Sequence, residues 1–341
     1  MALLPRQNAC KGRDLLRRMT LALAVSLLCL LFSGCAAQED TSGDTSGASG
    51  SGSMAQDSSD ARTPDAGRTG SGTVDADDEQ ESGEGESEEE DGTFRAVFLD
   101  VGKGDCILLS TQGKTMMVDT GYEDTADDVL DALETYGIES LQAMVITHYD
   151  KDHVGGAAQI AEQIPVGTFY LPGYTGEEDK CGDLLELIEM EGLHAVSVTE
   201  DLCFSLGDAS ICVDAGLVPF DAEEKNDNDA SLIVTAAYGE DSWLLPGDIE
   251  KPAMEVWLSE RARHYDILKM PHHGRKEDNT AAFIKAVSPA IAVITDSNDD
   301  EASEKVLKKL DKNGAAVFRS SLNGTIKITG YGIGKYDVKT E

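Results

Sequence analysis

Four side chains able to bind a metal ion crowd into six positions directly after an apolar run. The stretch 147–156 reads Thr-His-Tyr-Asp-Lys-Asp-His-Val-Gly-Gly, and its candidate ligands are His148, Asp150, Asp152 and His153. Two imidazoles and two carboxylates supply the donors that zinc, manganese or iron accept, whereas without a metal the carboxylates would repel each other. A solvated polar loop is the ordinary alternative, but this ligand density favours a metal site. The two glycines allow a tight turn into a helix that begins near His153.

Three further strand ends carry related chemistry. Asp119 follows an apolar strand, Asp248 follows another, and His272 and His273 follow a third. Each alone has a plain explanation, because aspartate beside glycine forms turns and a loop histidine is often a surface residue. Since scaffolds place ligands on loops at strand ends, one convergent site explains all four segments better.

Strand-length apolar runs alternate with amphipathic helical segments from Phe94 onward, which predicts mixed sheets with helices on their outer faces. No internal repeat is evident. The expected strands cover 94–99, 106–110, 115–118, 143–146, 166–171, 202–206, 210–213, 231–236, 242–245, 267–270, 291–294, 316–318 and 325–328, and the expected helices cover 126–133, 157–164, a segment around 184–188 ending at Gly192, 253–258, 281–286 and 304–310.

Residues 1–35 have the layout of a secretory signal. Arginines precede an uncharged apolar run from Leu21 to Phe32, which is short for a membrane span and is followed by small residues. The run Leu31-Phe32-Ser33-Gly34-Cys35 resembles a bacterial lipoprotein signal, in which Cys35 would be lipidated. An uncleaved single-span anchor is the alternative, and both predict an exported, membrane-attached domain at the outer face of the membrane.

Residues 36–92 predict a disordered tether, because they contain seventeen acidic residues against two arginines and almost no large apolar side chain. An acidic interaction tail is the alternative, but no motif supports it and no protein partner is predicted. Residues 93–341 remain strongly acidic, with 46 Asp or Glu against 21 Lys or Arg, a net charge of −25. Such a domain lacks the basic surface that unassisted nucleic-acid binding requires.

Four cysteines belong to the domain: Cys106, Cys181, Cys203 and Cys212. None has Cys-x-x-Cys spacing, so a thiolate metal site is not expected. A hairpin turning at Gly207-Asp208 would place Cys203 opposite Cys212, and outside the cytoplasm the two could be oxidised. Because a cross-strand disulfide is geometrically awkward, two half-buried free cysteines are the expectation.

The ordered set of motifs resembles the metallo-β-lactamase fold superfamily, and within it the hydrolase domain of ComEC-type DNA-uptake competence proteins. The resemblance covers nearly all of residues 94–331. It implies a four-layer αβ/βα sandwich of two mixed sheets. The motifs are Phe98-Leu99-Asp100-Val101-Gly102-Lys103-Gly104-Asp105, where the family usually has Gln at the position of Lys103, Val118 to Gly121, His148 to Gly156, Asn226 to Leu232, Leu245 to Asp248, His272 to Gly274 and Asn323 to Ile326.

The resemblance also implies a ligand set for two divalent ions. His148 and Asp150 would hold the first, with Asp150 standing where most members have histidine, and Asp152, His153 and His273 would hold the second. Asp248 would bridge them and Asp119 would orient ligands. No third histidine completes the first position, where Asn228 or a water is the candidate, and His272 is a further possible ligand. The oxygen-rich set leaves zinc or manganese open.

The chemistry that follows is hydrolysis by a metal-bridged hydroxide, with Asp152, Asp248 and Asp119 as the catalytic residues. A phosphodiester substrate, such as DNA or nucleotides, is the leading hypothesis. Lys103 would add a positive charge near that substrate, although a solvent-facing lysine is the more ordinary expectation. The alternatives are a lactone, lactam or thioester hydrolase, and a non-catalytic lipoprotein that binds metal or a ligand.

Overall fold

The computed structural model describes residues 92–341; the predicted signal peptide, Cys35 and residues 36–91 of the tether lie outside the described residues. No helix within 92–341 has both the length and the apolar character of a membrane span. The strands are β1 (Phe94–Phe98), β2 (Ile107–Thr111), β3 (Lys114–Val118), β4 (Ala143–Val145), β5 (Phe169–Pro172), β6 (Ala195–Val198), β7 (Leu202–Leu206), β8 (Ala209–Asp214), β9 (Ile233–Tyr238), β10 (Asp241–Leu245), β11 (Ile267–Lys269), β12 (Ile291–Ile294), β13 (Ala316–Arg319), β14 (Ile326–Gly330) and β15 (Tyr336–Thr340). The helices are η1 (Glu123–Thr125), α2 (Ala126–Thr135), α3 (Lys151–Val154), α4 (Ala157–Gln163), α5 (Glu178–Glu191), α6 (Lys251–Glu260), η2 (Pro271–Gly274), α7 (Thr280–Val287), α8 (Glu304–Lys312) and α9 (Ser320–Asn323).

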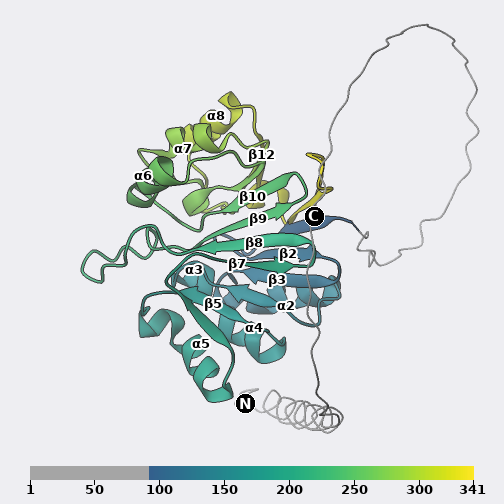
Figure 1. Cartoon of the computed structure of the whole chain (residues 1–341), viewed down its shortest axis with the longest axis vertical. Coiled ribbons are helices and arrows are strands. Elements are labelled where there is room, and N and C mark those ends of the chain that lie inside the picture. Colours follow the sequence, from purple (N-terminus) through teal and green to yellow (C-terminus); the bar gives the residue numbers. More distant parts are fainter. Residues whose placement is uncertain (1–91) are drawn as a thin grey trace, which may run out of the picture. The chain divides into compact units, whose positions relative to one another are not determined.

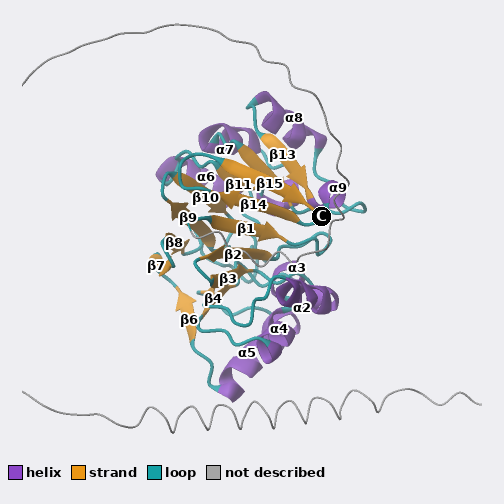
Figure 2. Cartoon of the chain, turned by 90° about the vertical axis from the view of Figure 1, so that its right-hand side faces the viewer, coloured by secondary structure: helices purple, strands orange, loops and turns teal. Residues whose placement is uncertain are grey.

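Two mixed sheets lie face to face with helices outside both. The first has the strand order β15-β14-β1-β2-β3-β4-β5-β6, and the second has the order β13-β12-β11-β10-β9-β8-β7. Helices α2, α4 and α5 cover the first sheet, whereas α6, α7 and α8 cover the second (Figures 1 and 2). The predicted four-layer sandwich of two mixed sheets is therefore confirmed.

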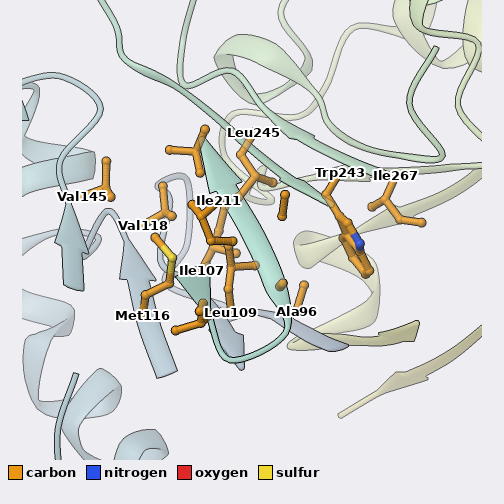
Figure 3. Close-up of a cluster of buried hydrophobic side chains, with 14 of the residues drawn as sticks. Ala96, Ile107, Leu109, Met116, Val118, Val145, Ile211, Trp243, Leu245 and Ile267 are labelled. Carbon is orange, nitrogen blue, oxygen red and sulfur yellow. The ribbon is translucent and has the colours of Figure 1, made fainter. Parts of the chain in front are cut away.

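Strand alternation divides the apolar side chains between three cores. Along β1, Phe94, Ala96 and Phe98 point between the sheets, while Val97 packs under the helices on the other face. The central core joins both sheets, as the side chains of Ile107, Met116, Ile211 and Trp243 show in Figure 3. Because both faces of each sheet are covered, the inner strands are apolar on both sides, which explains why their sequences lack a clean alternation.

The strand directions bring distant loops to one edge of the sandwich. Strand β3 pairs parallel with β4 in the first sheet. In the second sheet, β11 pairs parallel with both β10 and β12. The loops that follow these strands hold the predicted ligands, so parallel pairing places carboxyl ends, and the side chains beyond them, side by side.

Most predicted elements are confirmed within a few residues, and the exceptions have physical causes. The edge strands β6 and β15 were missed, because half-exposed strands of mixed composition carry little apolar signal. Helix α5 begins earlier than expected. The helix expected to start near His153 is instead two short pieces, and His153 lies inside the first of them, α3.

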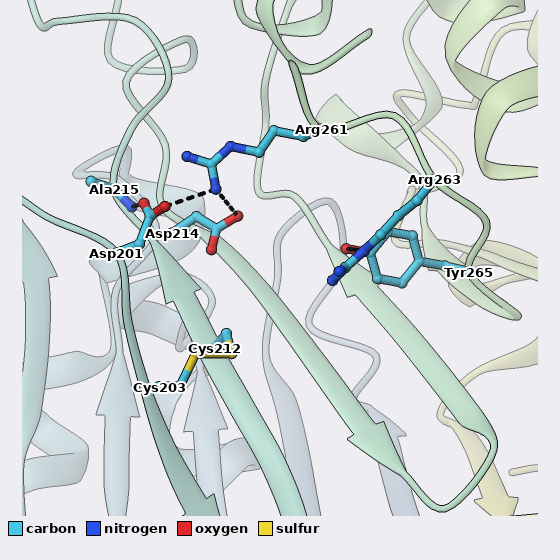
Figure 4. The surroundings of a disulfide bond; sticks show 8 residues. All are labelled: Asp201, Cys203, Cys212, Asp214, Ala215, Arg261, Arg263 and Tyr265. Atoms are coloured by element: carbon cyan, nitrogen blue, oxygen red, sulfur yellow. Dashed lines mark hydrogen bonds and ion pairs between the residues drawn. A yellow bond between two sulfur atoms is a disulfide. The ribbon is translucent and has the colours of Figure 1, made fainter. Parts of the chain in front are cut away.

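The expectation of two free cysteines in the β7–β8 hairpin was wrong. The register places Cys203 opposite Cys212, as predicted, but the two form a disulfide (Figure 4). Their Cα atoms lie 4.0 Å apart, because paired residues of a hairpin approach closely enough for the sulfurs to meet. Cys106 and Cys181 are buried and reduced.

Candidate metal centre

The predicted ligands from three strand ends converge on one buried place. His153 belongs to three groups of ligand-type atoms that lie within 4.8 Å of one another; one of them adds Asp105 and Asp119, and the other two hold the predicted ligands. Of these two, one adds His148 and Asp248, and the other adds Asp152 and His273. Both groups join residues 148–153, which follow β4 of the first sheet, to a loop of the second sheet. The centre therefore exists only when the two sheets pack together.

Three imidazoles present the same nitrogen to this place. The Nε2 atoms of His148, His153 and His273 are buried and have no hydrogen-bond partner among the described residues. Their Nδ1 atoms are held from behind: that of His153 lies 2.8 Å from Asp119 Oδ2, and that of His273 lies 2.9 Å from Thr295 O. An imidazole fixed through Nδ1 with a bare Nε2 is the usual arrangement of a metal ligand.

Asp248 is the carboxylate nearest to these bare nitrogens. Its Oδ2 lies 3.4 Å from His153 Nε2 and 3.0 Å from His273 Nε2. Asp152 Oδ2 lies 3.5 Å from His273 Nε2. Burial alone would raise the pKa of Asp248, but His273, Lys269 and His153 hold it well below its usual range. Asp248 is therefore ionised and lies near the Nε2 atoms of both His153 and His273, and its bridging role stays a prediction.

The histidines differ in protonation when no metal is present. Burial, followed by the charge of His153, lowers the pKa of His148 to about 4, so this ring is neutral. Burial opposes the charge on His153, yet Asp248 and Asp119 raise its pKa well above the usual value. The pKa of His273 is also raised, by Asp248 and by its contact with Asp152, against the effect of burial. Without a metal, protonation of His153 and His273 is thus favoured over protonation of His148.

Asp119 has the contacts of an orienting residue. Its Oδ1 accepts the backbone N–H of Thr147 at 2.7 Å, and its Oδ2 accepts the Thr147 hydroxyl at 2.7 Å as well as contacting His153. Asp119 itself adopts φ 57°, a left-handed conformation that aspartate tolerates better than most residues. The carboxylate of Asp119 therefore contacts the Nδ1 side of the His153 ring, away from the bare Nε2 atom.

A lysine and an aspartate that sequence reasoning did not assign complete the centre. Lys269 is fully buried, and its Nζ lies 2.5 Å from Asp105 Oδ2 and 2.9 Å from Asp248 Oδ1. Asp105 Oδ1 also accepts the hydroxyl of Thr295 at 2.6 Å. A charged residue inside the apolar run Ile267 to Met270 was the available signal, because a buried lysine needs a carboxylate partner.

Asp150 lies at the margin of the centre. One of its oxygens is 3.8 Å from His148 Nε2, while the other accepts a hydrogen bond from Lys180 Nζ at 2.7 Å. Lys180 also contacts Asp227 Oδ2 at 3.0 Å. Asp150 belongs to neither ligand group around His153. Its role as a ligand of the first position stays a prediction, and Lys180 already neutralises part of its charge.

The expectation of a solvent-facing Lys103 was wrong. Its Nζ lies 3.3 Å from Asp152 Oδ2 and 3.8 Å from Asp300 Oδ2, and the side chain is 22% exposed. Arg275 also pairs with Asp300, at 2.7 Å. Lys103 therefore pairs with the candidate ligand Asp152, and Lys103 and Arg275 share the partly exposed carboxylate of Asp300. Next to Lys103, Gly104 packs against the chain at Asp152, where a Cβ would meet a carbonyl oxygen at 2.7 Å.

The remaining two candidates do not join the ligand groups around His153. His272 is buried, but its Nδ1 lies 3.1 Å from Glu250 Oε1 rather than facing Asp248. Asn228 donates its side-chain N–H to the same carboxylate at 3.0 Å. The structure therefore places His272 and Asn228 in a neighbouring cluster, and the possibility that they complete the first metal position has no support from these contacts.

The chain is similar in sequence to several known proteins. Residues 99–193 match the family described as the Metallo-beta-lactamase superfamily. ComE operon protein 3 of Bacillus subtilis is 27% identical over 255 residues, which cover 67% of this chain and 32% of the relative. Competence protein ComA of Neisseria gonorrhoeae is 24% identical over 250 residues, 71% of this chain and 33% of the relative. The chain thus spans about a third of the length of these relatives. The solved metallo-beta-lactamase fold protein YhfI of Bacillus subtilis has 12% identity and a TM-score of 0.48, covering 69% of this chain and 99% of that one.

Proposed function

Because this chain carries a metallo-β-lactamase superfamily domain of the ComEC-like kind, we propose that it is an exported, metal-dependent hydrolase of phosphodiester bonds. The observation that carries the proposal is the set of three buried histidines whose Nε2 atoms lack partners and face Asp248 or Asp152. Such a set fits divalent cations, because nitrogen and carboxylate oxygen are the donors that zinc and manganese share. When bound, a metal pair supplies a water that is nucleophilic at neutral pH and a charge that offsets the developing anion.

The residues of the chain then have separate tasks. Asp119 and Thr295 orient the rings of His153 and His273 through Nδ1. Lys269 keeps Asp105 and Asp248 ionised in a buried setting, so that Asp248 remains able to bind cations on its other oxygen. None of these groups is placed to attack a substrate carbon or phosphorus itself. The proposed reaction is therefore direct hydrolysis without a covalent enzyme intermediate.

Lys103 and Arg275 favour an anionic substrate over a neutral lactone or lactam. Both lie at the rim of the centre, within reach of Asp300. In a domain with a net charge of −25, cations at this rim give a phosphodiester a local binding site that the rest of the surface denies it. The same overall charge disfavours long duplex DNA, so nucleotides, short single strands or a cell-surface phosphodiester polymer fit better.

Location outside the cytoplasm is part of the proposal. The signal-like N-terminus with Cys35 predicts lipid anchoring, and the Cys203–Cys212 disulfide suits an oxidising compartment. The name of one relative, Competence protein ComA, connects that protein with competence. A role of this chain in DNA uptake is a proposal only, because the chain spans about a third of the length of these relatives.

Turnover by the full chain with Mn²⁺ or Zn²⁺ tests this function. We expect cleavage of bis(p-nitrophenyl) phosphate and of a short single-stranded oligonucleotide, and no cleavage of a chromogenic lactam, a lactone or a thioester. His153→Ala or Asp152→Ala should abolish turnover, whereas His194→Ala, a histidine remote from the centre, should retain it. Hydrolysis of the lactam or lactone with an untouched phosphodiester would reject the substrate class, and a metal-loaded protein inert on every ester would favour a binding role.

The rim cations allow a finer test. Lys103→Gln combined with Arg275→Gln should raise KM for the oligonucleotide about tenfold or more, because two charge-assisted contacts are removed. The control Lys276→Gln removes a neighbouring cation that pairs with Asp278 instead. An equal KM in the double variant and the control would show that the rim does not bind substrate.

A further inference from the structure

A second cluster of ligand-type side chains lies beside the centre, on residues that flank two of its members. Glu250 stands two positions after Asp248, and His272 directly precedes His273. With Glu277 they offer three ligand atoms within 4.8 Å of one another. This cluster, Glu250, His272 and Glu277, joins the start of α6 to η2 and to the segment before α7. It shares no residue with the two ligand groups of the centre.

Like the imidazoles of the centre, the imidazole of this cluster has a buried nitrogen without a hydrogen-bond partner among the described residues. His272 is 7% exposed, and its Nδ1 is buried without a hydrogen-bond partner. Nδ1 lies 3.1 Å from Glu250 Oε1, the same oxygen that accepts the side-chain N–H of Asn228. The contact therefore places two ligand-type atoms side by side at one position. On the other side of the ring, Nε2 lies 3.5 Å from Arg275 Nη1. This distance is the upper limit for a hydrogen bond, so the contact with Arg275 fixes the tautomer of His272 only weakly.

An amide oxygen adds a fourth donor. Asn228 gives its Nδ2 hydrogen to Glu250 Oε1 at 3.0 Å, which fixes the side chain against the cluster. Its Oδ1 is buried and has no partner among the described residues. Buried carbonyl oxygens of side chains are nearly always satisfied in folded proteins, so this oxygen, on a side chain held against Glu250, is a donor available to a cation.

The charges of the cluster point the same way. Glu250 and Glu277 lie close to Asp229, whose Oδ1 accepts the backbone N–H groups of Glu250 and Ala253. Burial, followed by the charge of Glu250, raises the pKa of Glu277, and His272 and Lys276 offset this only in part. Two carboxylates thus lie around a single imidazole, with the third, Asp229, close by. A divalent cation would relieve their repulsion.

The geometry points to a further cation site, separate from the predicted catalytic pair, in which Glu250, His272, Glu277 and the Asn228 oxygen bind one divalent ion. Three oxygen donors and one nitrogen suit Mn²⁺, with Zn²⁺ as the rival ion. Bound there, the ion ties the loop that carries Asp248 to the turn that carries His273. Both residues of that turn, His272 and His273, have positive φ near 50°, so the tie would hold a costly conformation in place.

Counting bound Mn²⁺ tests the site without any assay of activity. The full chain, stripped with a chelator and titrated with Mn²⁺, would be followed by the electron paramagnetic resonance signal of free Mn²⁺. We expect the Glu250→Gln/Glu277→Gln double variant to bind one equivalent fewer than the wild type. Asp278→Asn, which removes the exposed carboxylate next to Glu277, should bind as many as the wild type.

The outcomes separate this site from the proposed hydrolase. An unchanged count in the folded double variant, checked by circular dichroism, would overturn the site whatever the enzyme cleaves. Loss of one equivalent would support it even if every ester assay failed. A second readout is thermal: Mn²⁺ should raise the Tm of the wild type by more than that of the double variant, and equal shifts would overturn the site as well.

Discussion

Lys269 gives the sharpest test of the electrostatics of the centre. Its side chain is fully buried, and its Nζ lies between Asp105 and Asp248, with Gly247 O at 3.1 Å as a third acceptor. Lys269→Met keeps the length of the side chain and removes the charge. Two buried carboxylates then lose their counter-charge, which should cost about 3–5 kcal/mol of unfolding free energy. For a domain of this size that corresponds to a fall in Tm of roughly 6–20 °C.

The pH and metal dependence of this loss follow from the same contacts. In the wild type, burial opposes ionisation of Asp105 and Asp248, but Lys269 helps to lower the pKa of both. Their stabilising effect is thus present above the usual carboxyl range and fades as the pH falls through the lowered pKa. Without the lysine their pKa rises, so the loss of stability should be larger at pH 8 than at pH 5. Mn²⁺ bound by Asp248 should also reduce the loss.

Urea unfolding of the full chain at pH 5 and pH 8, with chelator or with Mn²⁺, measures these effects. Lys305→Met is the matched control, because Lys305 is exposed on α8 and the same change there should alter stability by less than about 0.5 kcal/mol. If Lys269→Met unfolds like this control, or if its loss does not grow with pH, Lys269 is not the counter-charge of the centre.

Three other predictions follow from the described contacts. Asp119→Asn should weaken Mn²⁺ binding by about 10–100-fold while leaving the fold intact, because it perturbs the orientation of His153; calorimetry that shows unchanged affinity would refute this. Metal binding should tighten from pH 6 to pH 8 and release protons, because the raised pKa values of His153 and His273 make protons compete with the metal; calorimetry in two buffers of different ionisation enthalpy counts them, and zero release would contradict the assignment. Reducing the Cys203–Cys212 disulfide, or replacing both cysteines by serine, should lower stability by about 2–3 kcal/mol for a loop of this length, as urea midpoints would show; identical midpoints with and without reductant would argue against the bond.

The local patterns were reliable where burial dominates. The inner strands of both sheets and helices α2, α6, α7 and α8 follow from apolar runs and from helical periodicity, because each buries a continuous face. The edge strands β6 and β15 were not predicted, because a strand with one unpaired edge and exposed side chains can be polar and then lacks an apolar pattern. The hairpin register of Cys203 and Cys212 was also predictable, whereas their oxidation depended on how closely the two chains approach.

The composition of the centre was predictable from residue types alone. Histidines and aspartates gathered at strand ends have few uses besides metal binding, and His148, Asp152, His153, Asp248 and His273 were found in this way. The residue types and their spacing could not show which ligand atoms face one another. His272 and His273 are neighbours in the chain, yet one turns to Glu250 and the other to Asp248, because successive residues with positive φ point their rings apart.

The sequence by itself thus determined which residue types are available as ligands and which strands present them. Both depend only on short-range periodicity and on residue chemistry. Folding decided what no local pattern encodes: that Lys269 is the buried counter-charge, that Lys103 turns inward, and that a second cluster forms around His272. These contacts join residues that are far apart in the sequence, such as Asp105 and Lys269. The contact between these two residues forms only when one sheet packs against the other. Charge pairing across that interface depends on the distances between the charged atoms, and these distances are fixed only in the folded sandwich.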